Sequence, residues 1–485
     1  MIGQKTNYEA VIGLEIHVQL RTKTKMFAPE ATQYGAPPNT QTSAITLAHP
    51  GTMPTVSREA VSHAIKMGLA CQANITAHNW FDRKNYYYYD LPKGYQITQD
   101  KTPICRQGEV IIDTAAGETR AIPLTRIHLE EDTGKSMHTP AGDKMLVNFD
   151  RTGTPLIEIV TAPALHTAEE ASSFVAEIRR LVRYLGISDG DMEKGSLRCD
   201  ANVSIKPKGS KVLGNKVELK NMNSMRHIRL AITHEIARQI DLKQEGTPIT
   251  SQTRAYDVQK GESVFKRKKE GLTDYRFFTE PDISPFYVSP EWIATERKAM
   301  PALPRALMKK FIHTYHLNPK DAAVLVDEKA TSLYFEAICQ HTPHYKPAAN
   351  WVIGPIKSYL NREKIAWADF TLTPKTIAAL VDIVAAGKIN FSGAVQKLFT
   401  KLVENPSLTL VSLLKGQVLQ ISDEAQLNSW ITAALDKYPA KIKAYHAGQH
   451  GLLGLFMGEV MRLSDRKADP KKTMTLLTKQ LTTRQ

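Results

Sequence analysis

The sequence has 485 residues, which is too long for one ordinary hydrophobic core and predicts two or three domains. A net charge of +14 and a pI near 9.3 favour a polyanionic partner such as nucleic acid, and the stretch from Lys437 onward carries ten basic against three acidic residues. No apolar run is long enough to span a membrane, the first residues do not resemble a signal peptide, and the four cysteines lie far apart, so we expect a cytoplasmic protein without disulfides.

Residues 11–20 alternate apolar and polar side chains with a period of two, which predicts a strand with one dry and one polar face. Glu15 and His17 share the polar face, two residues apart. A carboxylate beside an imidazole suits a divalent metal, whereas an ordinary half-exposed strand explains this single segment equally well.

The same alternation returns in later segments, where short stretches gather charged and amide side chains on one face. These polar residues are Arg126, His128, Glu130, Glu158, Arg198, Asp200, Asn202, Ser204, Glu218 and Lys220. We interpret them as a concave polar sheet surface that holds metal and phosphate, in preference to a plain solvated face.

Two helices are expected among these strands. Thr167 and Glu170 form a capping box that opens a helix, whose apolar stripe runs from Phe174 to Leu185. A second helix is predicted near Met225–Leu242. Both should cover the dry face of the sheet, which gives an α+β domain.

The pattern changes after Pro290. Residues 291–405 are typical of helices separated by prolines, and a small helical module follows from about Ser407. Glycines between 448 and 458 suggest two closely packed helices there, and Pro470 is expected to begin the last helix.

One segment resembles a phosphate-binding loop but does not match the complete P-loop pattern. Gly134-Lys135-Ser136 resembles the end of a P-loop, but Leu129 stands where the first glycine is required, and acidic residues fill the space between. If ATP binds here, we expect it to bind through Mg²⁺ held by carboxylates. The chain has no Rossmann fingerprint and no recognisable nucleophile for hydrolysing glutamine.

Long motifs in a fixed order identify the family that the chain resembles. They are Gly13–His17, Phe81–Tyr86, Asp90–Ile97, Leu129–Lys135, Asp150–Val160, Glu193–Ser204, Glu218–Ser224, Asp274–Phe278, Glu280–Asp282 and Gly416–Glu424. Over nearly its whole length the chain is similar to the GatB-type subunit of the aspartyl/glutamyl-tRNA(Asn/Gln) amidotransferases.

This resemblance implies a ligase that uses ATP and Mg²⁺. It phosphorylates the side-chain carboxylate of Glu-tRNA(Gln), Asp-tRNA(Asn) or both, and ammonia then displaces the phosphate. The resemblance also implies a heterotrimer, in which an amidase-type glutaminase subunit supplies ammonia through a channel and a small third subunit holds the other two together.

The implied fold has three parts. A cradle-like catalytic domain around a bent antiparallel sheet covers residues 1–294, an all-α helical domain covers 295–406, and a basic helical tail module of the YqeY type covers 407–485. The last two parts are expected to bind tRNA. Candidates for phosphate contacts in the tail are Lys441, Lys443, Arg462, Arg466, Lys467, Lys471 and Lys472.

Candidate active-site residues are those that match the motif positions of the family or lie on the predicted polar face of the sheet. The metal-binding positions of the family fall on Glu15, His17, Glu130, Glu131 and Glu158. Arg198, Lys220 and Lys135 are candidates for contacting phosphate oxygens. Asp200, Asn202 and Glu218 are candidates for orienting ATP or the aminoacyl end. For each of these residues, the alternative is a hydrogen bond with a purely structural role. Lys84 and Tyr86 are expected at the end of the ammonia route.

Four consecutive tyrosines at 86–89 allow two interpretations. Tyr86 and Tyr88 should share one strand face, where they either contact the unpaired 3′ end of tRNA or line the ammonia exit. Alternatively, the segment is an aromatic strand that packs on itself. The family usually has Phe and Pro at the positions of Tyr87 and Tyr89, which makes Tyr86 and Tyr88 the better candidates.

One departure from the family concerns zinc. Many members hold zinc with four cysteines, and Ala28, Glu30, Ser43 and Thr46 stand at those positions here, so we expect no zinc. Two rival functions are less favoured: a non-catalytic tRNA-binding scaffold, against which the intact carboxylate set argues, and a metal-dependent phosphohydrolase of small substrates, which has no use for the basic tail.

Overall fold

The computed structural model describes residues 7–268, 275–405, 407–415, 423–465 and 467–483. The chain divides into two compact units, Met1–Pro304 and Arg305–Gln485. The segment 416–422 at the start of the predicted tail module, Asp274 and Arg466 lie outside the described residues. The predicted domain boundaries after residues 294 and 406 stay predictions.

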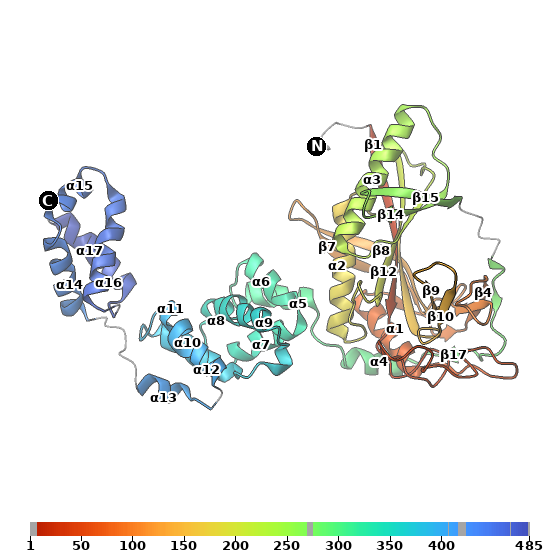
Figure 1. The fold of residues 1–485 in the computed structure, drawn as a ribbon, viewed down its shortest axis with the longest axis horizontal. Helices are drawn as coiled ribbons and strands as arrows, with labels where there is room; N and C mark the ends of the chain where they lie inside the picture. Colours follow the sequence, from red (N-terminus) through yellow and green to blue (C-terminus); the bar gives the residue numbers. More distant parts are fainter. Residues whose placement is uncertain (1–6, 269–274, 406, 416–422, 466, 484–485) are drawn as a thin grey trace. The chain divides into compact units, whose positions relative to one another are not determined.

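The first unit is built on a ten-stranded sheet (Figure 1). Its order is β15-β14-β13-β12-β1-β11-β8-β6-β2, and β7 pairs with β8 outside this path. The strands are β1 (Tyr8–Gln19), β2 (Asn74–Ile75), β6 (Cys105–Arg106), β7 (Glu109–Asp113), β8 (Thr119–Glu131), β11 (Pro155–Thr161), β12 (Leu197–Pro207), β13 (Val217–Lys220), β14 (Gln252–Asp257) and β15 (Glu262–Lys268).

Strand pairing is antiparallel throughout this sheet except between β13 and β14. The purely antiparallel sheet that we expected is therefore wrong at this one pair. The reason is the connection, because helix α3 (Met225–Gln244) links the two strands, and a crossover helix returns the chain in the same direction.

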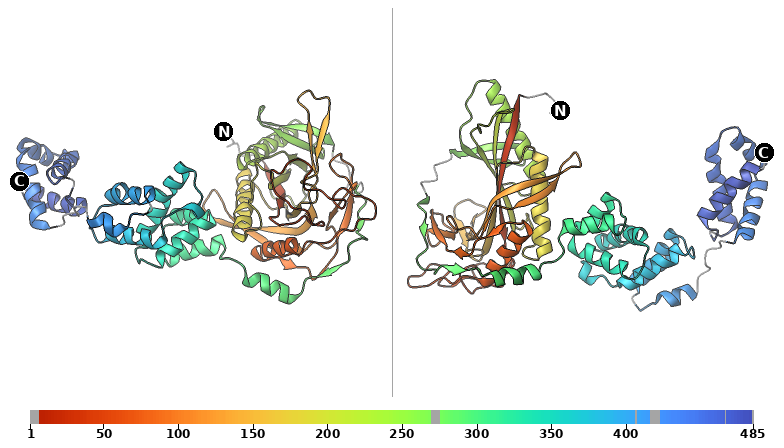
Figure 2. Two further views of the ribbon diagram at one scale, coloured as in Figure 1. Left: turned by 60° about the horizontal axis from the view of Figure 1, so that its bottom comes forward. Right: turned by 180° about the vertical axis from the view of Figure 1, so that it is seen from behind.

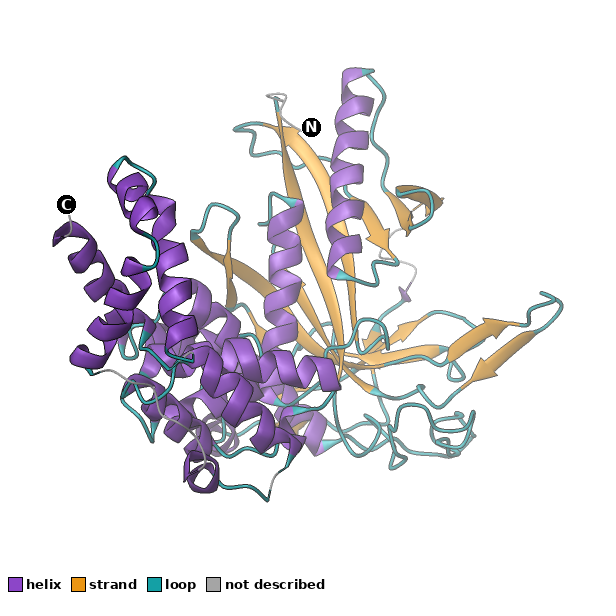
Figure 3. Ribbon diagram, turned by 60° about the vertical axis from the view of Figure 1, so that its left-hand side comes forward, coloured by secondary structure: helices purple, strands orange, loops and turns teal. Residues whose placement is uncertain are grey.

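Helices cover the dry face of the sheet. On β1, Leu14, Ile16 and Val18 are almost completely buried, as the alternation predicts. Helix α1 (Arg58–Ala70) packs on β8, α2 (Ala168–Leu185) on β7, and α3 on β12. Figure 3 shows the two long helices α2 and α3 along the strands, and Figure 2 shows α2, in yellow, beside the orange β7 from behind.

The sequence signals of α2 are confirmed. Thr167 is the N-cap and accepts a hydrogen bond from the backbone N–H of Glu170 at 3.0 Å. The predicted apolar stripe between Phe174 and Leu185 is buried in the main core. Gly186 ends the helix with a left-handed φ of 71°, which glycine adopts without strain.

Smaller elements surround one end of the large sheet. A three-stranded sheet has the order β16-β4-β5, two further pairs are β17-β3 and β10-β9, and helix α4 packs on α1. Their bounds are β3 (His78–Asn79), β4 (Asp82–Asn85), β5 (Tyr95–Thr98), β9 (Lys135–His138), β10 (Met145–Asn148), β16 (Phe278–Thr279), β17 (Phe286–Tyr287) and α4 (Pro290–Lys298). Strand β4 ends at Asn85, so the tyrosines 86–89 form a loop and not the strand that we expected.

The second unit contains helices joined by loops, and no β-strand, among its described residues. Its elements are α5 (Pro304–His313), α6 (Pro319–Val326), α7 (Lys329–Cys339), α8 (Tyr345–Trp351), the π-helix η2 (Val352–Ile356), α9 (Lys357–Glu363), η3 (Trp367–Asp369), α10 (Pro374–Ala385), α11 (Phe391–Ala394), the π-helix η4 (Val395–Phe399), α12 (Thr400–Glu404), α13 (Leu410–Lys415), α14 (Glu424–Asp436), α15 (Pro439–His446), η5 (His450–Leu452), α16 (Leu453–Leu463) and α17 (Pro470–Thr483).

Helices α14, α16 and α17 share a small hydrophobic core that includes Leu427, Phe456 and Leu477. Pro470 begins α17, as expected. The glycines of α16 do not bring two helices together, because a Cβ at Gly454 or Gly458 would meet nothing within 4 Å. Among the described helices of both units, none has the length and apolar character needed to cross a membrane.

Candidate active site

One row of residues crosses the polar face of the sheet on four neighbouring strands. His128 of β8 pairs with Glu158 of β11, and Glu158 pairs with His17 of β1. His17 in turn pairs with Arg198 of β12. Directly paired residues share a face and lie about 5 Å apart, so the register alone brings these four side chains together.

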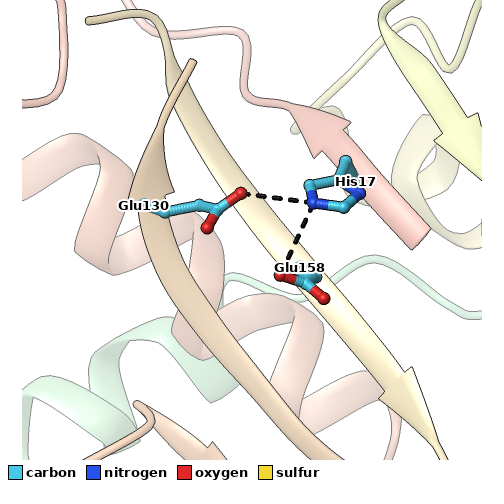
Figure 4. Close-up of side chains that lie close together, drawn as sticks. All are labelled: His17, Glu130 and Glu158. Atoms are coloured by element: carbon cyan, nitrogen blue, oxygen red, sulfur yellow. Dashed lines mark ion pairs between the residues drawn. The ribbon is translucent and has the colours of Figure 1, made fainter. Parts of the chain in front are cut away.

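Glu130 completes a group that could hold a metal ion. His17 Nε2 lies 3.3 Å from Glu130 Oε1 and 3.5 Å from Glu158 Oε2 (Figure 4). One ligand atom from each residue lies within 4.8 Å of the other two, and no second group of this kind occurs in the described parts of the chain. We call His17, Glu130 and Glu158 the His17 cluster. His128 flanks it, with Nε2 at 3.1 Å from Glu158 Oε2.

The carboxylates and imidazoles keep one another charged. Burial by itself would lower the pKa of His17, but Glu158 and Glu130 outweigh it and raise that pKa to about 9. The same carboxylates raise the pKa of His128 against the effect of burial. Burial would raise the pKa of Glu158, but the two imidazoles hold it well below its ordinary value. The cluster is therefore a set of buried, mutually neutralised charges.

The donor set fits a divalent cation. Two carboxylate oxygens and one imidazole nitrogen converge, and about a quarter of the His17 side chain is exposed, which leaves the group open on one side. Mg²⁺ is commonly held by one or two carboxylates and completes its shell with waters and substrate phosphates. The assignment of His17, Glu130 and Glu158 as metal ligands stays a prediction.

Arg198 is held beside this cluster by Asp132. Arg198 Nη2 donates to Asp132 Oδ2 at 2.8 Å, and Gln19 Nε2 donates to the same oxygen at 2.8 Å. Burial would raise the pKa of Asp132, but Arg198 and Arg151 lower it below its ordinary value. We did not predict Asp132 or Gln19, although the period-2 pattern was the available signal: each lies two residues beyond a cluster residue on its strand.

A second polar network lies next to the cluster on β1, β12 and β13. Lys220 forms an ion pair with Asp200, and its Nζ lies 3.6 Å from Glu218 Oε1. Asn202 Nδ2 donates to Glu15 Oε1 at 2.9 Å. The structure thus brings together the residues predicted to orient ATP or the aminoacyl end. We expected Glu15 to join His17 as a metal ligand, but Glu15 is hydrogen-bonded to Asn202 and is not part of the His17 cluster.

Glu131 is a clearer departure from the expected metal site. Adjacent residues of a strand point to opposite faces, so Glu131 points away from Glu130. Its Oε1 accepts a hydrogen bond from the backbone N–H of Ile97 at 3.0 Å and is ion-paired with Lys93. Glu131 and Lys93 line a cavity together with Phe27 and other residues. The grouping of Glu131 with the metal ligands is therefore not supported.

Lys84, Tyr86 and Lys135 lie outside the cluster. Lys84 Nζ is 5.8 Å from the ring centroid of Tyr86, and the Tyr86 hydroxyl donates to Gln96 Oε1 at 3.2 Å. Burial raises the pKa of Tyr86, and the carboxylates at the end of β8 raise it further, so this hydroxyl lies in their field. Lys135 is exposed at the start of β9.

Three of the four positions at which the family resemblance implies cysteines form ordinary hydrogen bonds here, namely Glu30, Ser43 and Thr46. Thr46 Oγ1 donates to Glu30 Oε1 at 3.1 Å, and Ser43 Oγ accepts from the backbone N–H of Ile45 at 3.1 Å. Ala28 and Thr46 belong to the wall of the same cavity as Glu131. One carboxylate beside hydroxyls and a methyl group is a poor donor set for zinc.

Comparison with known proteins agrees with the motifs. The family model described as "GatB/GatE catalytic domain" matches residues 10–294, and the model described as "GatB domain" matches residues 333–481. The chain is 42% identical to the GatB subunit of the aspartyl/glutamyl-tRNA(Asn/Gln) amidotransferase of Acaryochloris marina, with 98% of both chains covered. It is also 42% identical to the protein of the same name from Thermosynechococcus vestitus, covering 98% of this chain and 96% of that one, and 41% identical to one from a Synechococcus strain, covering 98% of both.

The first family model covers the strands that carry the His17 cluster, Arg198 and Lys220, and the second covers most of the helical unit. Both models and the full-length relatives lead to the same assignment: the chain belongs to the family of GatB subunits of the aspartyl/glutamyl-tRNA(Asn/Gln) amidotransferases.

Proposed function

We propose that the chain is the ATP-using, tRNA-binding subunit of an amidotransferase that converts Glu-tRNA(Gln), Asp-tRNA(Asn) or both into Gln-tRNA(Gln) and Asn-tRNA(Asn). The observation that carries the proposal is the His17 cluster, which lies on a polar sheet face beside Arg198 and near Lys220. Enzymatic phosphoryl transfer depends on such metal-ligating carboxylates and positioned cations more than on covalent catalysis.

The reaction has two steps. A side-chain carboxylate oxygen of the misacylated residue attacks the γ-phosphorus of ATP, the bond to the β,γ-bridging oxygen breaks, and ADP leaves. The lone pair of ammonia then attacks the acyl carbon, the bond from that carbon to the phosphate oxygen breaks, and inorganic phosphate leaves as the nitrogen loses a proton. The product is a side-chain amide on the same tRNA.

In this proposal the His17 cluster holds Mg²⁺, with His17 as a neutral ligand and Glu130 and Glu158 as carboxylate ligands. When bound, Mg²⁺ neutralises negative charge on the β- and γ-phosphates of ATP. His128 stays outside the ligand set and orients Glu158 from the other side, at 3.1 Å.

Arg198 and Lys220 stabilise the charge that develops on phosphate oxygens. Both are kept in place by a carboxylate, Arg198 by Asp132 and Lys220 by Asp200. A cation that is already oriented needs no rearrangement when charge develops in the transition state, which is the main source of electrostatic catalysis.

The remaining polar residues are given orienting roles. We assign to Asp200, Asn202 and Glu218 the hydrogen bonds that orient ATP or the aminoacyl end, because they surround Lys220 and Glu15 on the same face. Lys135 is exposed and is proposed to contact phosphate.

Ammonia must come from another protein, because the chain has no recognisable glutaminase residues. We infer that an amidase-type glutaminase subunit and a small third subunit are its partners in a heterotrimer, and that an enclosed ammonia route ends near Lys84 and Tyr86. Ammonia has to arrive unprotonated, since ammonium has no lone pair with which to attack the acyl carbon.

We further propose that the first unit forms a cradle for the aminoacyl end and that residues 295–406 and 407–485 bind the body of the tRNA. Among the described basic candidates of the tail, Lys441, Lys443, Lys471 and Lys472 are exposed. Arg462 is already ion-paired with Glu459 at 2.6 Å, which makes it a weaker candidate. Contacts of this type give affinity that depends on salt concentration and not on sequence.

The test uses the complete heterotrimer, misacylated tRNA, ATP and either glutamine or ammonium chloride. Glu158→Gln should abolish tRNA-dependent ATP hydrolysis and amidation, because it removes a cluster carboxylate while keeping the size of the side chain. tRNA binding should stay within about twofold, which also verifies folding. Glu109→Gln is the matched control, since Glu109 is an exposed carboxylate at the start of β7.

The isolated chain provides the second half of the test. With ATP and misacylated tRNA it should amidate with ammonium chloride and fail with glutamine. ATP turnover that survives Glu158→Gln would contradict the proposed site. A wild-type complex that binds tRNA without consuming ATP would favour the non-catalytic scaffold instead.

A further inference from the structure

Three consecutive tyrosines in the loop after β4 expose most of their surface. Tyr87, Tyr88 and Tyr89 expose 76%, 59% and 76% of their surface, which is unusual for three large side chains in a row. We call these three residues the tyrosine surface. They belong to the loop that follows β4, and the roles assigned under the proposed function do not use them.

The loop that carries them has a defined conformation. The backbone N–H of Leu91 donates to Tyr88 O at 3.1 Å, and the N–H of Gly94 donates to Leu91 O at 3.0 Å. The Tyr87 ring lies against Gly94, because a Cβ on that residue would come within 3.0 Å of Tyr87 Cε1. The loop backbone and the Tyr87 ring are therefore held in place before any partner binds, which lowers the entropic cost of binding.

Tyr86 connects the tyrosine surface to the active site. Its ring contacts that of Tyr88 edge to face, with centroids 5.8 Å apart, while its hydroxyl is bonded to Gln96. Gln96 Nε2 donates in turn to the carbonyl oxygen of Glu131, the last residue of β8. Two side chains, Tyr86 and Gln96, thus connect the exposed Tyr88 ring to the strand end that carries Glu130.

Positive charge lies near the loop that carries these tyrosines. Lys84 Nζ is 5.0 Å from the ring of Tyr275, which itself contacts Tyr86 with centroids 6.2 Å apart. On the other side, the N–H of Gly134 donates to Asp90 O at 2.8 Å, which places the exposed Lys135 one residue from the tyrosine loop. Aromatic faces next to lysines are the combination that binds single-stranded nucleic acid.

We propose that the tyrosine surface stacks on the unpaired nucleotides at the 3′ end of the aminoacyl-tRNA. This inference rests on the proposed function, because the aminoacyl ester can reach the His17 cluster only if the adjoining nucleotides pass close to this end of β8. Stacking accepts any base, since every base has a π face, so the surface needs no base-specific hydrogen bonds.

A protein partner is the competing occupant. We favour RNA because Lys84 lies over the ring of Tyr86, which Tyr88 contacts, and because the exposed Lys135 lies close to the tyrosine loop. The contacts of Tyr86 also lead from the loop to the strand end that carries Glu130. Apolar protein-docking surfaces, in contrast, have charged residues depleted from their centres. The experiment distinguishes the two partners.

The test compares the full-length chain in its heterotrimer with three variants. One replaces all three tyrosines with alanine, one replaces them with phenylalanine, and Tyr34→Ala is the control. Tyr34 is 72% exposed, and Lys194 Nζ lies 5.7 Å from its ring centroid, so it matches the tested residues in exposure and in its neighbouring cation. Dissociation constants are measured for intact aminoacyl-tRNA and for the same tRNA without its unpaired 3′ nucleotides.

The alanine variant should bind intact tRNA more weakly by roughly 5- to 150-fold for each stacked base, the range that corresponds to ~1–3 kcal/mol per base. Its log–log salt slope should equal that of the wild type, because stacking releases no counterions. The shortened tRNA should bind equally well to both. The phenylalanine variant and Tyr34→Ala should stay within about twofold of the wild type, because each keeps the aromatic surface.

Equal affinities of wild type and alanine variant for intact tRNA would overturn the proposal, and so would an equal loss with the shortened tRNA. Failure of the alanine variant to assemble with the glutaminase partner, with RNA affinity unchanged, would assign the surface to a protein partner. Amidation by the wild-type complex is scored in the same preparation, so a failure of the proposed function is seen separately from a failure of stacking.

Discussion

Binding of Mg²⁺ to the His17 cluster should compete with a proton. The pKa of His17 is raised to about 9, so its imidazole is protonated at neutral pH, whereas a metal ligand must be neutral. Glu158 and Glu130 have lowered pKa values and stay ionised over the whole neutral range. Apparent metal affinity should therefore rise with pH up to about 9 and level off above that value.

The size of the effect follows from the titration of one group. With a pKa of about 9, roughly 1% of His17 is neutral at pH 7 and about half at pH 9. The apparent affinity for Mg²⁺ should then rise roughly fiftyfold between these pH values, or ~2.3 kcal/mol. An imidazole with the ordinary pKa near 6.5 would give a change of less than about twofold over the same interval.

Isothermal titration calorimetry provides the measurement. Titrations at several pH values give the affinity, and repetition in two buffers with different heats of ionisation gives the number of protons released, which should be about one per Mg²⁺ at pH 7 to 8. His17→Gln keeps an oxygen ligand but cannot titrate, so it should show weaker binding with little pH dependence. Binding that changes less than twofold from pH 7 to 9 without proton release, or an unchanged slope in His17→Gln, would refute the reasoning.

Asp132→Asn should lower the rate of tRNA-dependent ATP hydrolysis by about 10- to 100-fold while leaving tRNA affinity unchanged, because Arg198 loses the carboxylate that orients it; an unchanged turnover number in steady-state assays would count against an electrostatic role for Arg198. Elemental analysis should find no stoichiometric zinc, since Ala28, Glu30, Ser43 and Thr46 stand where the family resemblance implies four cysteines, and one zinc per chain would contradict this. Removal of residues 407–485 should weaken tRNA binding and flatten its salt dependence, with each lost phosphate contact lowering the log–log slope by somewhat under ~1. If the shortened chain keeps the wild-type slope in a salt titration, the basic tail does not bind phosphates.

The faces of individual elements could be predicted from the sequence. Alternation in β1 and the capping signal at Thr167 depend on residues that are neighbours in the chain, and the structure agrees with both. Strand pairing depends instead on residues far apart in the chain. The parallel β13–β14 pair depends on the crossover through α3, which connects the two strands and packs on β12 and β15, and no short sequence pattern specifies this packing.

For the candidate site, too, local sequence patterns could be predicted and the pairing of distant strands could not. The period of two predicts which residues lie on the polar face of the sheet. It does not predict that His17 pairs with Glu158, because alternation does not specify the register between strands. Grouping Glu131 with Glu130 followed the family resemblance and ignored strand parity, which alone separates the two side chains. His128 was recognised as a member of the polar face. Its position beside Glu158 was not predicted, because that position depends on the register of β8 and β11.

The central position of β1 has a consequence for synthesis of the protein. This strand is made first, yet its partners β11 and β12 begin only at Pro155 and Leu197. At typical translation rates of about 5–20 residues per second, β1 must wait roughly 10 to 40 s before both of its edges are covered. During that time a strand with one apolar face and unpaired backbone groups is exposed outside the ribosome, which is the situation that promotes aggregation. The nascent chain is therefore expected to depend on chaperone binding to its first twenty residues, and the catalytic centre can assemble only after Lys220 of β13 has emerged.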